Sequence, residues 1–361
     1  MEINTLSIQD FRSLSLKTIH FKTPVTILIG NNNAGKTTIL ESIYFCSNLK
    51  SFKTTPNQEL IKKGSDCFKI SLNYTNKSLK NNIFIEKSLN VSKCSVNNKK
   101  ISKKSLYNIF PCYSLVFGFN NILLNDSSYR RDFLDSGLFH VEQKSYTAIS
   151  NFNKIIKQRN YLLKSKNLKD LKFWNTQLIN SNLVVNEYRS NYFTVLKNEL
   201  HKIISLLKDT DHNIYNDISS IDINYYNGWG SGHYENVLKE NTEKDINIGY
   251  TSSGSHRSDF TIISNNTPVK ESGSMSTLVL SCLLVTLAKI NVFHVKHGYK
   301  PALLIDDLFF GIDDNNLNTV IKLLVSSKGN IVVTSPSIYE EILSNVDQNN
   351  KEITLMDMGV V

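Results

Sequence analysis

The chain is poor in proline: it has six, and none lies between residues 112 and 267. Because proline breaks a helix in its interior, this absence permits long uninterrupted helices. The cysteines are odd in number, widely spread and form no CxxC pair, so neither a disulfide framework nor a zinc site fits. They are Cys46, Cys67, Cys94, Cys112 and Cys282. This usage favours a reducing cytoplasm.

Long apolar runs are also missing. The longest, 278–288, holds eleven residues before Lys289 and predicts a buried helix, since roughly 20 residues are needed to cross a bilayer. The N-terminal sequence MEINTLSIQDFRSL lacks the basic start and continuous apolar stretch of a signal peptide. We therefore expect a cytoplasmic protein with no membrane partner.

Length and composition favour two globular domains. The 361 residues are 40% hydrophobic and 10% aromatic, which is enough to bury a core. Forty-one basic residues against 32 acidic ones give a net charge of +9. This charge favours a polyanionic partner, although it also serves solubility.

The first part of the chain predicts strands and the middle predicts helices. Segments 3–8 and 25–29 have the patterns of strands, and short β-branched pieces within 66–105 predict an antiparallel sheet. From residue 126 onward the apolar residues recur at the helical period. A long antiparallel helical hairpin or small bundle is expected there.

Strand patterns return in the last third of the chain. They occupy 221–226 and 259–264, and recur in PALLIDD and NIVVTSP after an apolar helix. The two ends therefore share α/β character. We predict an α/β fold with a discontinuous head, 1–125 and 219–361, and an inserted helical domain, 126–218.

The sharpest motif is GNNNAGKT, which fits G-x-x-x-x-G-K-[ST] between an apolar strand and a helix. Glycines in such a loop let backbone N–H groups and a helix N-terminus face a phosphate. Lys36 is expected on the β- and γ-phosphates of ATP, and Thr37 on Mg²⁺. An accidental Gly-Lys turn is the alternative reading. The expected nucleotide-binding residues are Gly30, Asn31, Asn32, Asn33, Ala34, Gly35, Lys36, Thr37 and Thr38.

A second element is the apolar segment LLIDD, which ends in Asp306 and Asp307. In P-loop proteins such a strand holds the aspartate that binds magnesium through water, the role predicted for Asp306. Asp307, one residue further on, is placed to orient or polarise an attacking water. The alternative is an acidic pair that merely ends a strand. Lys36, Asp306 and Asp307 are the predicted catalytic residues, and Thr37 and Asp306 the predicted metal ligands.

About 270 residues separate Lys36 from the acidic strand, a distance typical of ABC- and SMC-type ATPase heads with a helical insertion. The chain carries, in order, LSIQDFRSL, GNNNAGKTTILESIYF, YRRDFLDSGLFH, NFNKIIKQRN, GSHRSDF and LLIDDLFFGIDD. With these motifs it resembles the RecF family of recombination-repair ATPases over nearly its whole length. The resemblance implies a P-loop ABC/SMC-type head with mixed sheets around the P-loop helix.

Two of these motifs have an ordinary reading when taken alone. Arg130 and Arg131 in YRRDFLD then belong to a solvated turn of helix, and His256 in GSHRSDF is a surface histidine. The family pattern has proline where this chain has Ser255.

The resemblance also implies an ATP-dependent homodimer, in which a Ser-x-Gly-Gln signature of one subunit covers the ATP of the other. Here the signature aligns with Ser274-Met275-Ser276-Thr277, and only the serine is kept. A two-residue shift would place Ser272 and Gly273 there instead. Elements near Phe117 and Asp313 also depart from the family pattern. We therefore predict retained ATP binding with a weak, DNA-stimulated ATPase activity.

Basic residues concentrate in two places, which predicts two surfaces for DNA phosphates. One group follows the P-loop helix: Lys50, Lys53, Lys62 and Lys63. The other lies on the helical insertion: Lys154, Lys157, Arg159, Lys164, Lys166, Lys169 and Lys172. A solvated helix face is the ordinary alternative.

The family implies binding of double-stranded or gapped DNA, partners RecR and RecO, and support of RecA loading. A non-hydrolysing ATP-bound scaffold is the second reading. An SMC-like or transporter-type ATPase and a nuclease fit less well, because the insertion lacks sustained heptads and no carboxylate-rich domain follows Asp307.

Overall fold

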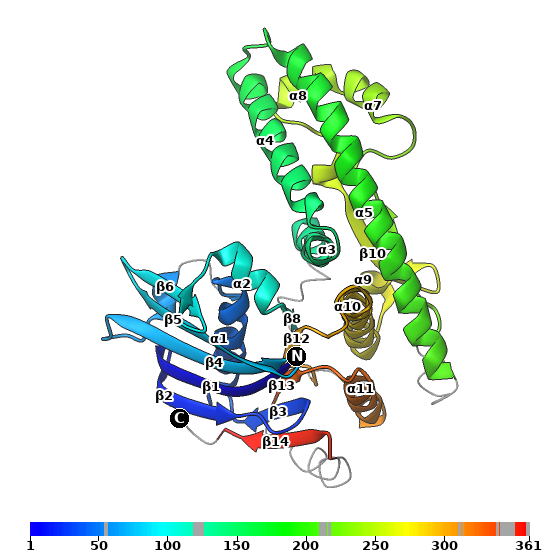
Figure 1. Ribbon diagram of the computed structural model, residues 1–361. Helices are drawn as coiled ribbons and strands as arrows, with labels where there is room; N and C mark the ends of the chain where they lie inside the picture. Colours follow the sequence, from blue (N-terminus) through cyan, green and yellow to red (C-terminus); the bar gives the residue numbers. More distant parts are fainter. Residues whose placement is uncertain are drawn as a thin grey trace. The chain divides into compact units, whose positions relative to one another are not determined.

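The computed structural model describes residues 1–53, 57–117, 126–208, 215, 218–309, 312, 314–336, 339 and 351–358. The chain divides into two compact units (Figure 1). Met1–Asn121 and His297–Val361 form the first unit, and Ile122–Lys296 forms the second.

An antiparallel sheet of six strands forms one layer of the first unit, in the order β2-β1-β4-β5-β6-β7. Its strands are β1 Glu2–Phe11, β2 Leu14–His20, β4 Cys67–Asn76, β5 Leu79–Ser88, β6 Ser92–Val96 and β7 Lys99–Lys100. In β4 alternate residues are buried, the two-residue period of a sheet with one covered face. The antiparallel sheet predicted within 66–105 is confirmed and gains β1 and β2 as further strands.

The second layer is a five-stranded parallel sheet in the order β14-β3-β13-β12-β8. Its strands are β3 Val25–Gly30, β8 Cys112–Val116, β12 Ala302–Asp306, β13 Ile331–Pro336 and β14 Ile353–Asp357. β3 and β12 are buried along their full length, as expected for central parallel strands covered on both faces. The strands predicted from PALLIDD and NIVVTSP are confirmed as β12 and β13.

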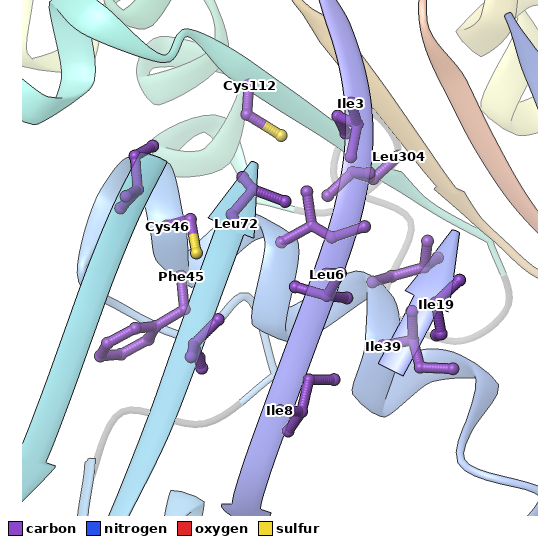
Figure 2. Close-up of a cluster of buried hydrophobic side chains, with 14 of the residues drawn as sticks. Ile3, Leu6, Ile8, Ile19, Ile39, Phe45, Cys46, Leu72, Cys112 and Leu304 are labelled. Carbon is purple, nitrogen blue, oxygen red and sulfur yellow. The ribbon is translucent and has the colours of Figure 1, made fainter. Parts of the chain in front are cut away.

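Helix α1 lies between the two sheets and contacts strands of both. The helical elements of this unit are α1 Lys36–Asn48, η1 Asn57–Leu60, α2 Lys103–Ile109 and α11 Asp314–Ser326. Phe45 of α1 packs its ring edge-on against Phe68, and Phe68 packs likewise against Phe11, with centroid distances of 5.4 and 4.9 Å. Figure 2 shows the surrounding cluster, in which Leu6 and Ile39 have no exposed surface. This core fixes α1, and with it the end of the P-loop, against both sheets.

The described part of the second unit consists of three helices, several short elements and a final long helix. They are α3 Ser127–Val141, α4 Lys144–Ser165, α5 Leu171–Lys208, α7 Tyr234–Glu240, α8 Thr242–Ile248, η2 Ser255–Arg257, α9 Val269–Ser272 and α10 Met275–His297. α4 and α5 pack along one another, which confirms the predicted helical hairpin. α5 runs for 38 residues within the proline-free stretch.

A three-stranded antiparallel sheet, β11-β10-β9, belongs to the same unit. Its strands are β9 Ile221–Tyr226, β10 Asp259–Ser264 and β11 Thr267–Pro268. β9 packs against α5 and β10 against α3, so this compact unit extends to Lys296. The helical domain was predicted to end at residue 218, whereas the second unit ends at Lys296. The sequence pattern changes from helix to strand near residue 218, but the strands that follow still pack against the helices of the same unit.

α10 is long and apolar enough to cross a membrane by length and composition alone. However, 78% of its most apolar window is buried inside the structure, as in the core helix of a globular protein. Phe293 stacks edge-on against His140 of α3, with a centroid distance of 5.1 Å. The apolar segment 278–288 is therefore part of a buried helix, as predicted.

The YRRDFLD and GSHRSDF motifs, which are about 120 residues apart in sequence, meet in this unit. Arg130 holds Asp259 through two hydrogen bonds of 2.7 and 2.8 Å, and Arg131 donates to the carbonyl oxygen of Ser258 at 2.9 Å. The reading of these arginines as a solvated helix turn is therefore wrong. Their chemistry needs acceptors that only the folded chain brings to them.

Arg189 of α5 joins the same two motifs from a buried position. Its guanidinium makes two hydrogen bonds of 2.8 Å to the carboxylate of Asp135. It also donates to the carbonyl oxygen of Ser255 at 2.5 Å and to Ser258 Oγ at 2.9 Å. One side chain therefore ties α3, α5 and the η2 loop together.

His256 is mostly buried, so its reading as a surface histidine is wrong. Its Nε2–H donates to the carbonyl oxygen of Thr251 at 2.9 Å. Burial lowers the pKa of His256 to about 4, and the charges of Arg257 and Arg131 act in the same direction. The imidazole is therefore neutral at pH 7 in the folded protein.

We expect stability to fall as the pH drops from 6.5 toward 4, because the unfolded chain then binds a proton that His256 in the folded chain does not. The loss reaches about 3 kcal/mol at most. Urea unfolding at stepped pH values measures it. His256→Gln still offers a side-chain N–H donor but does not titrate, so it should flatten this pH dependence. His233→Gln, at an exposed histidine of the same unit, should not. Equal pH profiles for the wild type and His256→Gln would contradict the assignment.

Candidate nucleotide-binding site

The GNNNAGKT loop joins β3 to α1 at the carboxyl edge of the parallel sheet. Gly35 ends the loop with φ +78°, a left-handed conformation that favours glycine. A Cβ at this position would lie 3.0 Å from Leu14 Cδ2, so a side chain here would also require Leu14 to shift. The loop therefore turns sharply into the first residue of α1, which is Lys36.

Lys36 is folded back over the loop that precedes it. Its ammonium donates to the carbonyl oxygens of Gly30 at 2.6 Å and Asn31 at 2.9 Å, and its side chain is buried. A lysine held this way occupies the concave side of the loop, where the predicted phosphates would bind.

Thr37 and Asp306 meet directly, although 269 residues separate them. The Thr37 hydroxyl donates to Asp306 Oδ1 at 2.9 Å. Thr37 is the second residue of α1 and Asp306 is the last residue of β12, and β13 lies between β12 and β3 in the sheet. The predicted magnesium ligands are thus brought together by the strand order.

Burial shifts the pKa values of Lys36 and Asp306 in the directions that favour their neutral forms. Burial lowers the pKa of Lys36, and attraction to Asp307 and then Asp306 opposes the shift. Burial and the neighbouring Asp307 raise the pKa of Asp306, against hydrogen bonds from Thr334 and Thr37. Two carboxylates beside one lysine leave a negative site that a divalent cation would neutralise.

Asp307 follows the strand with φ +56°, a left-handed backbone that aspartate tolerates better than most residues. Its backbone N–H donates to Thr334 Oγ1 at 2.8 Å. The side chain is partly exposed, whereas Asp306 is buried. The two adjacent carboxylates therefore have different environments, which suits the different roles predicted for them.

Thr334 of β13 is a site residue that the sequence reasoning missed. Its hydroxyl donates to Asp306 Oδ1 at 2.8 Å while accepting the Asp307 N–H. The available signal was the polar end of NIVVTSP, because the carboxyl ends of neighbouring parallel strands share one edge.

Arg12, Glu41 and Ser51 form a second missed group. Arg12, in the turn between β1 and β2, donates to both carboxylate oxygens of Glu41 on α1, and Ser51 Oγ donates to one of them. Glu41 has no exposed surface, so the ion pair is largely removed from water. A charged residue inside an otherwise apolar helix face was the signal for it.

Lys53 follows this group, and its charge lowers the pKa of Asp306. The sequence reasoning assigned Lys53 only to a DNA surface. Its influence on Asp306 places its charge near the P-loop as well.

The remaining loop residues lie where the motif predicts. Asn31, Asn32, Asn33 and Ala34 form the turn, with Asn33 at φ +71° and a hydrogen bond of 3.2 Å from the Ala34 N–H to the Asn31 carbonyl. Thr38 lies in the first turn of α1. The N-cap residue of this helix is Gly35, which has no side chain to cap it, so its positive end can face an anion.

Ser274 belongs to the second unit and is the N-terminal cap of α10. Its Oγ accepts the Thr277 N–H at 3.1 Å. Gly273 cannot carry a side chain, because a Cβ would lie 2.6 Å from the carbonyl oxygen of Val269. Residues 118–121 and Asp313 lie outside the described residues.

Arg159 does not belong to a DNA-facing surface, contrary to the sequence reasoning. It has no exposed surface and donates to Asp245 Oδ2 at 2.8 Å and to Asn175 Oδ1 at 2.7 Å. The lysines predicted with it on the helical insertion are exposed.

Comparison with known proteins places this geometry in a family. Residues 1–305 match the family model described as an AAA ATPase domain. The chain is 30% identical to the DNA replication and repair protein RecF of Clostridium novyi (strain NT), covering 89% of this chain and 90% of that one. It is also 30% identical to the protein of the same name from Clostridium acetobutylicum, covering 96% of each.

Solved structures agree on the fold. The structure of the recombination mediator protein RecF with ATP matches with a TM-score of 0.76 and 23% identity, over 93% of this chain and 92% of that one. The Smc head domain from Pyrococcus furiosus matches with a TM-score of 0.55 and 14% identity, over 99% and 94%. The predicted P-loop head of ABC/SMC type is therefore confirmed.

Proposed function

Because the chain belongs to the RecF family of DNA replication and repair proteins, we propose that it binds ATP with Mg²⁺ at the P-loop and that the bound nucleotide controls its binding to duplex or gapped DNA. The observation that carries the proposal is the 2.9 Å hydrogen bond between Thr37 and Asp306, beside the folded-back Lys36. These are the side chains that a P-loop ATPase uses on phosphate and metal.

Each residue has a distinct role in this proposal. Lys36 exchanges its loop carbonyls for the β- and γ-phosphates, and the uncapped N-terminus of α1 faces the same charge. Thr37 and Asp306 would hold Mg²⁺, which when bound would supply positive charge against the phosphates. Asp307 orients the water that attacks, with its backbone fixed by Thr334.

The nucleotide would also control assembly. In our proposal ATP at the P-loop of one subunit is covered by the Ser274 segment of another, giving an ATP-dependent homodimer. Ser274 already caps α10, so the N-terminus of that helix is ordered around it. The dimer would act in the cytoplasm on gapped DNA, with RecO and RecR, to support RecA loading.

A non-hydrolysing scaffold is the second candidate. Ser276 stands where the family's signature has glycine, and its Cβ occupies a place where the backbone would approach a phosphate closely. Such a protein would bind ATP and DNA and dimerise weakly without turning the nucleotide over.

Phosphate release with and without duplex DNA separates the two candidates. DNA-stimulated release is expected from the wild type and a loss of about 100-fold or more from Asp307→Asn, because asparagine tolerates the left-handed backbone but carries no charge. Sedimentation of the same samples with ATP and Mg²⁺ measures dimerisation. ATP binding without phosphate release, and without an increase in the sedimenting mass of the protein, would support the scaffold and contradict the enzyme.

A further inference from the structure

The net positive charge of this chain is concentrated in one segment. Residues 67–110, from β4 through α2, hold nine lysines and one acidic residue, Glu86. The other 317 residues carry 32 basic and 31 acidic side chains. Nearly the whole net charge of +9 therefore belongs to one part of the first unit.

The strand register determines on which face of the sheet this charge lies. Ile83 and Ile85 of β5 are buried in the core that surrounds α1. Lys87 follows at the same two-residue period and so lies on the same face of the sheet, near the end of the strand. Glu86 lies on the opposite face, where Lys93 donates to it at 2.9 Å.

Two further lysines lie at the ends of helices that pack near this end of β5, which we call the margin of the sheet. α1 packs against both β5 and α2 (Figure 1). Lys50 follows the end of α1, and Lys103 is the first residue of α2. Lys50 and Lys103 are exposed, and Lys87 is partly exposed.

Lys50 and Lys87 lie close enough to Lys103 for their charges to act on it. Burial lowers the pKa of Lys103, and the charges of Lys50 and Lys87 lower it further. The repulsion between neighbouring lysine charges costs free energy, and an anion bound between them would offset that cost. Lys99 and Lys100 of the edge strand β7 are exposed and add positive charge to the same end of the antiparallel sheet.

We infer that Lys50, Lys87 and Lys103, the lysine trio, bind the phosphate backbone of duplex DNA, with Lys99 and Lys100 beside them. The inference rests on the proposed function and names its DNA surface. A duplex carries about one negative charge per 1.7 Å, so it offers several phosphates at once to lysines from three separate parts of the chain. Lysine acts as a point charge toward phosphate, so the contact carries no base preference.

The test uses the full chain with ATP and Mg²⁺ and a fluorescent 30-base-pair duplex between 50 and 200 mM salt. The logarithm of the affinity falls as the logarithm of the salt concentration rises. Replacing the trio by glutamine should make this negative slope shallower by about three. The matched control replaces Lys22, Lys328 and Lys351, which are exposed lysines of the same unit outside residues 67–110, and removes the same charge. The control should change the slope by less than one.

The outcomes separate this inference from the function on which it rests. Wild-type protein that does not bind the duplex would overturn the proposed DNA function. Wild-type binding with equal slopes for the trio and control variants would overturn only the assignment of the trio. A trio variant that also loses ATP binding would overturn it as well, because the lysines would then act through the nucleotide site.

Discussion

Lys36→Ala is expected to weaken ATP binding at least 100-fold, which is about 2.7 kcal/mol, as measured by calorimetry with Mg²⁺. The ammonium is buried and already held over the loop by the carbonyl oxygens of Gly30 and Asn31. A cation positioned in advance gives up little freedom when a phosphate arrives, so its loss removes most of the attraction.

The same substitution should not destabilise the fold. Burial lowers the pKa of Lys36, so keeping its charge in the folded state costs free energy. The melting temperature of Lys36→Ala should therefore equal or exceed that of the wild type. Lys22→Ala, at an exposed lysine of the same unit, is the control and should leave ATP affinity unchanged. Affinity within threefold of the wild type in Lys36→Ala would refute the P-loop assignment.

Arg189→Met is expected to lower the stability of the second unit by about 3–5 kcal/mol, because it leaves the carboxylate of Asp135 buried without its partner. Ser255 and Ser258 lose a donor at the same time. Because a chain of two units need not unfold in one step, hydrogen exchange of α3 and of residues 251–258 is the appropriate measurement.

Two controls isolate the ion pair. Arg189→Lys keeps the charge but cannot make both hydrogen bonds to one carboxylate, so it should recover part of the loss. Asp135→Leu combined with Arg189→Met removes both charges and should be more stable than Arg189→Met alone. Exchange rates for Arg189→Met equal to those of the wild type would show that this network does not hold the unit together.

Most strands and helices could be predicted because their patterns are local. β9 and β10 begin and end where the sequence predicts, and the apolar helix is found where its run indicates. The strands β2, β8 and β14 and the helices α2, α7, α8 and α11 were not predicted. β2 is an edge strand with few buried residues, and β8 and β14 become strands only by pairing with β12 and β3.

The amino-acid order alone determined the P-loop, the acidic end of β12 and the change between strand and helix patterns, because each depends on neighbouring residues. Tertiary structure decided which distant side chains meet. It brought Thr37, Asp306 and Thr334 to one sheet edge, buried Arg159 and Arg189 against carboxylates, and gathered Lys50, Lys87 and Lys103 at one margin. Such contacts depend on strand order and packing across more than a hundred residues, which no local pattern records.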